Sequence, residues 1–104
     1  MKKIAVIGLG LMGTPLSKRL IQAGYSVTGF DIVKSQIARL APVGLRPAGS
    51  PKEAARGADL ILLSLPSWDA VLEAVVGKEG VVHAAKKGQI IADTSTSPPW
   101  EAAS

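Results

Sequence analysis

The sequence contains no cysteine, and His83 is its only histidine. Without cysteine, the chain cannot form a disulfide framework, a thiolate metal site or a cysteine nucleophile. A single histidine argues against a histidine-based zinc site and against a Ser-His-Asp triad built within these residues. We therefore expect no metal ion and no self-contained hydrolytic site, and we expect His83 to be a surface residue in a helical stretch.

Aromatic residues and long apolar runs are also scarce. With one Phe and one Tyr, the chain offers no platform for stacking single-stranded nucleic acid, and Trp68 and Trp100 are expected to pack rather than to contact a ligand. The net charge is +4, but lysine and arginine are spread along the chain, as on ordinary solvated faces. No run reaches the roughly 18 apolar residues of a membrane span. We expect neither a nucleic-acid nor a membrane partner.

The first residues resemble a secretory signal peptide only superficially. Met1 and two lysines precede the apolar run Ile4–Leu9, which is too short for such a signal and leads directly into a glycine-rich turn. We expect a reducing, cytoplasmic location.

Apolar strands and amphipathic helices alternate along the 104 residues, which is the size of one domain. Strands that alternate with helices form a parallel sheet with right-handed crossovers, so the pattern predicts one doubly wound α/β domain over residues 1–104. Strands are predicted at Lys3–Gly8, Tyr25–Asp31, Leu45–Ala48, Asp59–Leu65 and Gln89–Asp93. Helices are predicted from Thr14 to about Gly24, over Ser35–Leu40, from Ser50 to near Gly57, and from Ser67 or Asp69 onward.

A glycine-rich turn joins the first predicted strand to the first predicted helix. Gly8, Gly10 and Gly13 form the pattern G-x-G-x-x-G. In this pattern the first glycine allows a sharp turn, the second lets a pyrophosphate approach the backbone, and the third lets the helix pack closely on the strand. The N–H groups and the dipole at the helix N-terminus favour an anion. The alternative is that the glycines serve packing alone.

Asp31, at the end of the second predicted strand, is placed to accept hydrogen bonds from adenosine ribose hydroxyls. A carboxylate there disfavours the 2′-phosphate of NADP, and the next residues, Ile32 and Val33, supply no arginine. Lys34 is the nearest cation. The turn and Asp31 together predict a Rossmann-type domain that binds NAD, with NADP as the alternative.

Three motifs occur in order along the chain. The opening KIAVIGLGLMGTPLSKRL has Met12 directly before the third glycine, LILLSLPS ends an apolar strand in Leu-Pro, and DTSTSP follows the fifth predicted strand. They resemble motifs of the β-hydroxyacid dehydrogenase family, which includes 3-hydroxyisobutyrate dehydrogenase, tartronate semialdehyde reductase and 6-phosphogluconate dehydrogenase. The resemblance covers nearly the whole chain.

This resemblance implies a set of cofactor-binding residues: Gly8, Leu9, Gly10, Leu11, Met12, Gly13, Asp31, Leu65, Pro66, Ser95 and Thr96. The turn would bind the pyrophosphate and Asp31 the ribose, while Leu65 and Pro66 would contact the cofactor at the sheet edge. Ser95 or Thr96 would lie near the nicotinamide ribose and the substrate, since ligands of open α/β sheets bind beyond the carboxyl ends of the strands. The alternative for these two hydroxyls is a helix cap or a turn that leads into the following prolines.

The family continues beyond such a loop with a sixth strand and an all-helical domain that carries its catalytic lysine, and the sequence contains neither. We therefore expect the cofactor-binding part of a dehydrogenase, incomplete after about five strands and without a catalytic residue of its own. When complete, the enzyme would oxidise a small 3-hydroxy acid, or reduce its semialdehyde, by hydride transfer. The alternatives are a stand-alone NAD-binding or regulatory module and another Rossmann enzyme such as a methyltransferase, whose cofactor has no pyrophosphate.

The fifth predicted strand would lack a neighbour on its outer side. Its residues Ile90, Ile91 and Ala92 carry no charge or proline that would discourage pairing with another chain. We therefore expect the chain to associate with itself.

Overall fold

The computed structural model describes residues 2–10 and 13–93. Within these ranges, five parallel strands form one sheet in the order β3-β2-β1-β4-β5, which confirms the predicted doubly wound α/β fold. The strands are β1 Lys3–Ile7, β2 Ser26–Phe30, β3 Arg46–Pro47, β4 Leu60–Leu63 and β5 Ile90–Asp93. The helices are α1 Gly13–Gln22, α2 Lys34–Leu40, α3 Pro51–Ala55 and α4 Trp68–Val76, with short 3-10 turns η1 Ala41–Val43 and η2 Val81–His83.

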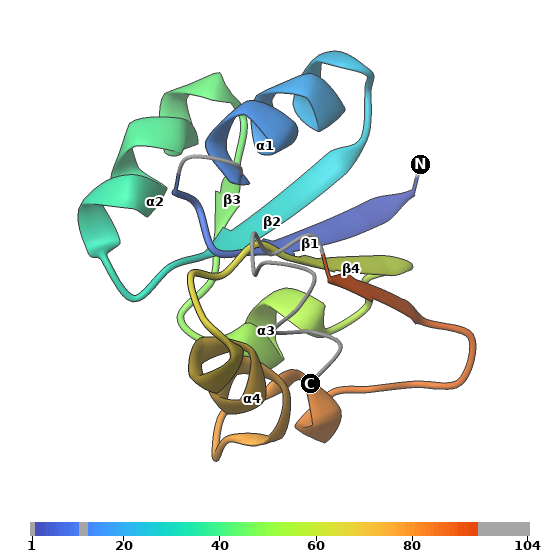
Figure 1. Ribbon diagram of the computed structural model, residues 1–104. Coiled ribbons are helices and arrows are strands. Elements are labelled where there is room, and N and C mark those ends of the chain that lie inside the picture. Colours follow the sequence, from blue (N-terminus) through green and yellow to red (C-terminus); the bar gives the residue numbers. More distant parts are fainter. Residues whose placement is uncertain (1, 11–12, 94–104) are drawn as a thin grey trace.

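Helices cover the sheet on both faces. Figure 1 shows α1 and α2 on one side of the sheet, and α3 and α4 on the other. One apolar cluster includes Ala5, Ile7 and Ile61, and a second includes Ile4 and Val6. Because successive side chains of a strand point to opposite faces, β1 contributes to both clusters, which explains its uninterrupted apolar sequence.

Serine side chains mark the beginning of two helices as predicted. The Ser50 hydroxyl accepts a hydrogen bond from the Glu53 N–H at 3.0 Å, and Pro51 occupies the first turn of α3. The Ser67 hydroxyl accepts from the Ala70 N–H at 3.2 Å, so α4 begins after Ser67 rather than at Asp69. These caps fix where the two helices begin at the carboxyl edge of the sheet.

The third strand is shorter than the predicted Leu45–Ala48, because only Arg46 and Pro47 pair with β2. Leu45 is instead buried against β2, where a Cβ on Gly29 would lie 2.9 Å from its methyl carbons. The packing of Leu45 therefore explains why β2 has a glycine in its interior: any side chain on Gly29 would overlap the Leu45 side chain.

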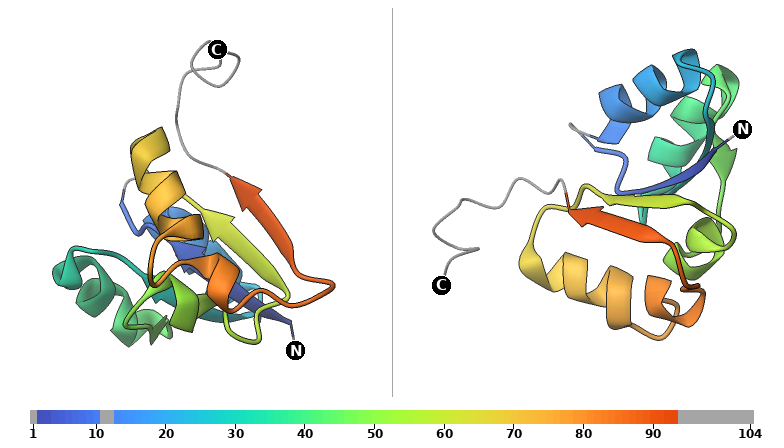
Figure 2. Two further views of the ribbon diagram at one scale, coloured as in Figure 1. Left: turned by 90° about the horizontal axis from the view of Figure 1, so that it is seen from below. Right: turned by 90° about the vertical axis from the view of Figure 1, so that its right-hand side faces the viewer.

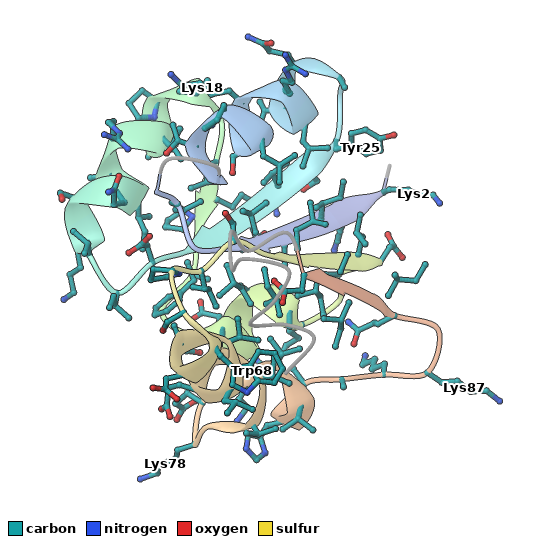
Figure 3. The ribbon with its side chains drawn as sticks, in the orientation of Figure 1. Lys2, Lys18, Tyr25, Trp68, Lys78 and Lys87 are labelled. Carbon is teal, nitrogen blue, oxygen red and sulfur yellow. The ribbon has the colours of Figure 1, made fainter. Side chains whose placement is uncertain are left out.

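Trp68 corrects the expectation that the tryptophans pack. Trp68 is the first residue of α4, where Figure 3 labels it, and its side chain is 63% exposed; Trp100 lies outside the described residues. His83 is exposed at the end of η2, as predicted, with Nε2 3.0 Å from the Gly77 carbonyl oxygen. No helix in the described ranges is long and apolar enough to cross a membrane.

Besides its pairing with β4, the edge strand β5 is held by the side chain of Gln89, the residue directly before it. The Gln89 side-chain amide donates to the carbonyls of Ala55 and Ala58 at 2.9 and 2.8 Å, and its oxygen accepts from the Lys86 N–H at 2.7 Å. Gln89 therefore links the start of β5 to the end of α3 and the turn into β4.

Replacing Gln89 with alanine should lower the free energy of unfolding by about 1–2 kcal/mol, because two carbonyl oxygens lose their donor. Urea unfolding followed by circular dichroism measures this change. Gln22→Ala, at the exposed end of α1, is the control and should not destabilise the fold. Equal stability of the two variants would contradict this role of Gln89.

Candidate functional site

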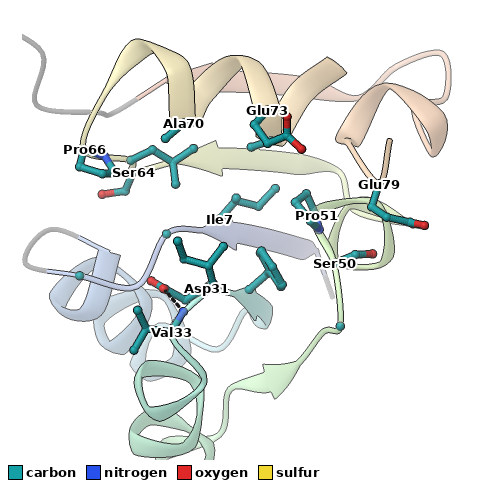
Figure 4. Close-up of a pocket in the computed structure, with 17 residues that line it drawn as sticks. Ile7, Asp31, Val33, Ser50, Pro51, Ser64, Pro66, Ala70, Glu73 and Glu79 are labelled. Atoms are coloured by element: carbon teal, nitrogen blue, oxygen red, sulfur yellow. Dashed lines mark hydrogen bonds between the residues drawn. The ribbon is translucent and has the colours of Figure 1, made fainter. Parts of the chain in front are cut away.

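The principal pocket of the described chain opens at the carboxyl edge of the sheet and has a volume of about 810 Å³. Its lining comes from the ends of β1, β2 and β4, from the start of α3 and from one face of α4 (Figure 4). In parallel α/β sheets, ligands bind outside this edge, where the chain crosses from one face of the sheet to the other. This position makes the pocket the candidate functional site.

Two of the three glycines in the turn are required by the fold. Gly8 has φ +98°, and a Cβ there would lie 2.0 Å from the Ser64 carbonyl oxygen. A Cβ on Gly13 would lie 1.9 Å from the Gly8 carbonyl oxygen, so α1 could not approach the turn so closely. Both distances are far below van der Waals contact.

Gly10 is different, because no part of the fold requires a glycine there. A Cβ on Gly10 meets no atom of the described residues within 4 Å, its φ is not positive, and the residue lines the pocket. Packing therefore explains Gly8 and Gly13 but leaves Gly10 unexplained. The missing side chain instead leaves open space at the N-terminal end of α1, where backbone N–H groups and the helix dipole favour an anion.

Asp31 is fixed beside this space by two backbone groups. Its Oδ2 accepts from the Leu9 N–H at 2.7 Å, and its Oδ1 accepts from the Val33 N–H at 2.8 Å; Figure 4 shows the second bond. A carboxylate can accept about four hydrogen bonds, so each oxygen can still bind a ligand hydroxyl. The carboxylate thus lies in the pocket wall with its orientation set before a ligand arrives.

The pocket brings together many of the predicted residues. Gly8, Gly10, Asp31, Leu65 and Pro66 all line it. The Leu9 side chain is fully buried in the core and its N–H is bonded to Asp31, so this residue supports the pocket wall. Gly13 lies beneath the turn. The predicted positions Leu11, Met12, Ser95 and Thr96 lie outside the described residues.

Sequence reasoning missed one wall of the pocket. Ser50 and Pro51 at the start of α3, and Ala70, Glu73 and Ala74 of α4, line it as well. These residues form no recognisable motif, and the spacing of Ala70 and Ala74 is that of any helix face toward a core. Only the packing of α3 beside α4 brings them to the pocket.

The charged residues in the described lining are all acidic. Asp31, Glu73 and Glu79 contribute carboxylates, and no lysine, arginine or histidine belongs to the described pocket lining. The lysines Lys2, Lys18, Lys78 and Lys87 instead point outward at separate places on the surface (Figure 3). Within this pocket, the described lining offers an anion only backbone N–H groups, whereas Lys18 and Arg39 line a smaller pocket that also contains Gly10.

A family model described as the NAD binding domain of 6-phosphogluconate dehydrogenase matches residues 3–104. The chain is 35% identical over 101 residues to 3-sulfolactaldehyde reductase of Escherichia coli, covering 97% of this chain and 34% of that protein. The chain thus spans about a third of the length of the curated relatives it matches.

Solved structures agree with this similarity. The 3-hydroxyisobutyrate dehydrogenase of Mycobacterium tuberculosis with L-serine superposes with TM-score 0.83 and 34% identity over 92% of this chain and 32% of its own. An imine reductase variant of Myxococcus stipitatus in complex with NAD⁺ superposes with TM-score 0.86 and 25% identity, over 96% of this chain and 34% of its own. The imine reductase of that organism has also been solved with NADP⁺.

The different surroundings of the glycines lead to a paired prediction. Gly10→Val should abolish NAD binding and leave the circular dichroism spectrum and the unfolding midpoint nearly unchanged, because the side chain enters open space. Gly13→Ala should instead destabilise the fold by about 1–3 kcal/mol, because its methyl group overlaps the Gly8 carbonyl. Calorimetric titration and thermal unfolding distinguish the two effects. Normal NAD binding by Gly10→Val would place the pyrophosphate elsewhere.

Proposed function

The chain belongs to the family of NAD-binding domains of 6-phosphogluconate dehydrogenase, and from this membership we propose how its pocket binds NAD(H). The pyrophosphate lies over Gly10 at the N-terminus of α1, and the adenosine ribose is bound by Asp31. Ser64, Leu65 and Pro66 surround the nicotinamide half. The residues Leu11, Met12, Ser95 and Thr96 remain predicted contacts of the same cofactor.

The observation that carries this proposal is that Gly10 and Asp31 meet in one pocket. Gly10 is the one glycine of the turn with free space at its Cβ position, as the close approach of a pyrophosphate requires. Asp31 has both oxygens oriented by backbone N–H groups and retains acceptor capacity for ribose hydroxyls. The alternative of a methyltransferase explains neither feature well, because its cofactor has no pyrophosphate.

For the complete protein, we propose hydride transfer between the cofactor and a small 3-hydroxy acid or its semialdehyde. Bound nicotinamide supplies a hydride donor or acceptor. Support comes from the relatives at 34–35% identity, which are named as a 3-hydroxyisobutyrate dehydrogenase and a 3-sulfolactaldehyde reductase. The described pocket lining has no lysine or histidine to move the alcohol proton, so we propose that this group lies outside residues 1–104. Residues 1–104 thus form the cofactor-binding domain. The cysteine-free composition fits the proposed cytoplasmic location.

Asp31→Ala should weaken NAD binding by about 1–3 kcal/mol, because charge-assisted hydrogen bonds to the ribose are lost. The unchanged chain should bind NAD more tightly than NADP, since the Asp31 carboxylate repels a 2′-phosphate, and the substitution should reduce this preference. Isothermal titration of the unchanged chain and of Asp31→Ala, each with NAD and with NADP, measures the four affinities.

Asp59→Ala is the matched control for Asp31→Ala. The Asp59 carboxylate also accepts a backbone hydrogen bond, from the Lys3 N–H at 2.9 Å, but it lies at the opposite edge of the sheet. Its loss should leave both dinucleotide affinities unchanged. Equal or tighter binding of NADP by the unchanged chain would overturn the assigned cofactor preference.

We further propose that two copies of the chain associate through β5. In the described part of the chain, β5 pairs with β4 on one side and with no strand on the other, and Figure 2 shows it at the outer edge of the sheet. Ile90 is 63% exposed and Ile91 is 45% exposed. An apolar edge strand of this kind is a template for pairing with another chain.

Ile91→Lys should shift the chain toward a monomer, because a charged side chain on the edge strand discourages pairing. Sedimentation velocity over a range of micromolar concentrations measures the association. Val76→Lys places the same side chain at another exposed apolar position, on α4, and should leave the association as it is. A single monomeric species of the unchanged chain at every concentration would refute this proposal.

A further inference from the structure

The pocket has a second end, opposite the turn and Pro66. In Figure 4, Ser50 and Pro51 lie on one side of this end and Glu73 of α4 on the other, with Ile7 beneath. A hydrogen bond of 2.8 Å from the Lys52 N–H to the Glu79 carbonyl oxygen joins α3 to the segment after α4. The two walls are therefore tied together, and the width of this end is set by the fold.

The wall on α4 combines small apolar side chains with one carboxylate. Ala70 and Ala74 lie one helical turn apart and line the pocket with small apolar side chains, which leave room for a ring beside the helix. Glu73 lies between them in sequence and also lines the pocket. Apolar walls with a few polar groups are typical of pockets that hold a nucleobase-sized ring.

The Glu73 carboxylate is placed differently from the Asp31 carboxylate. Both Asp31 oxygens accept backbone hydrogen bonds, whereas the Glu73 carboxylate takes part in no hydrogen bond or ion pair with the described residues. The Glu73 carboxylate lies close to Gly77: a Cβ on Gly77 would be 2.7 Å from Glu73 Oε1, so the glycine leaves room for this carboxylate. Figure 4 shows the Glu73 carboxylate directed toward the Pro51 side of the pocket, while that of Glu79 points away from it. An ionised carboxylate only accepts hydrogen bonds, so this end of the pocket favours a ring that donates one.

We propose that Glu73 accepts a hydrogen bond from the exocyclic amino group of the adenine ring and thereby selects adenine over hypoxanthine. This proposal rests on the proposed binding of NAD in the same pocket. Adenine presents an amino group at ring position 6, whereas hypoxanthine presents a carbonyl oxygen there, which a carboxylate repels. The pocket would then recognise the base through Glu73, the ribose through Asp31 and the pyrophosphate at Gly10.

Calorimetric titration of the full chain with NAD and with nicotinamide hypoxanthine dinucleotide tests the proposal. The two ligands differ only at the base, and we expect NAD to bind about tenfold more tightly, the effect of one hydrogen bond to a charged group. In Glu73→Gln the ratio should fall to about twofold or less, since an amide can accept from an amino group and donate to a carbonyl oxygen. Asp69→Asn removes the same charge from the same helix outside the pocket lining and should keep the wild-type ratio.

The outcomes separate this proposal from the proposed function. Binding of neither dinucleotide by the unchanged chain overturns both. Equal affinity of the unchanged chain for the two dinucleotides refutes selection by Glu73 and leaves NAD binding intact. Selection by Glu73 is also refuted if Glu73→Gln keeps the tenfold preference for NAD over the hypoxanthine dinucleotide. The same holds if Asp69→Asn loses this preference to the same extent as Glu73→Gln. Loss of the ratio in Glu73→Gln alone supports it.

Discussion

The close contact between the turn after β1 and the end of β4 determines the geometry of the whole site. Gly8 passes under the Ser64 carbonyl at positive φ, and α1 begins with Gly13 against the Gly8 carbonyl. The Gly8 N–H donates to Phe30 at 2.8 Å, and the next N–H, of Leu9, donates to Asp31 at 2.7 Å. One tight turn thus positions the helix N-terminus, the open space at Gly10 and the carboxylate. A change that loosens it displaces all three together.

The same contact divides the glycines into two classes that a motif cannot distinguish. Gly8 and Gly13 are surrounded by backbone atoms, so any side chain there disrupts the fold whether or not a ligand binds. Gly10 has no such neighbour among the described residues, so a Cβ there meets no steric conflict with them. Absence of described neighbours, rather than tight packing, therefore marks the glycine for which we propose a role in ligand binding. This distinction requires coordinates, because the three residues are identical in sequence.

Local sequence signals predicted the fold well, because each depends on neighbours in the chain. The apolar runs of β1 and β4 and the serine cap at Ser50 follow from periodicity and helix termini. Tertiary packing determined what these signals missed. β3 is shorter than predicted because the Leu45 N–H donates to the Leu40 carbonyl oxygen at 3.3 Å, and only Arg46 and Pro47 pair with β2. Trp68 is 63% exposed, although it was expected to pack. The wall formed by α3 and α4 was not predicted, since no local pattern says which helix faces a pocket.

The acidic lining of the pocket restricts how a dinucleotide can lie in it. Charges separated by less than about 10 Å are incompletely screened at ordinary ionic strength, so a pyrophosphate is repelled wherever Asp31, Glu73 or Glu79 is close. Compensating positive charge near Gly10 comes from the N-terminus of α1 and from Lys18 and Arg39, which line the smaller pocket that also contains Gly10. In the binding mode that we propose, the phosphates lie at the turn and the uncharged parts of the ligand extend along the rest of the pocket. In this proposed mode, the positive groups near Gly10 set the orientation of the cofactor, and the carboxylates are left to accept hydrogen bonds from its neutral groups.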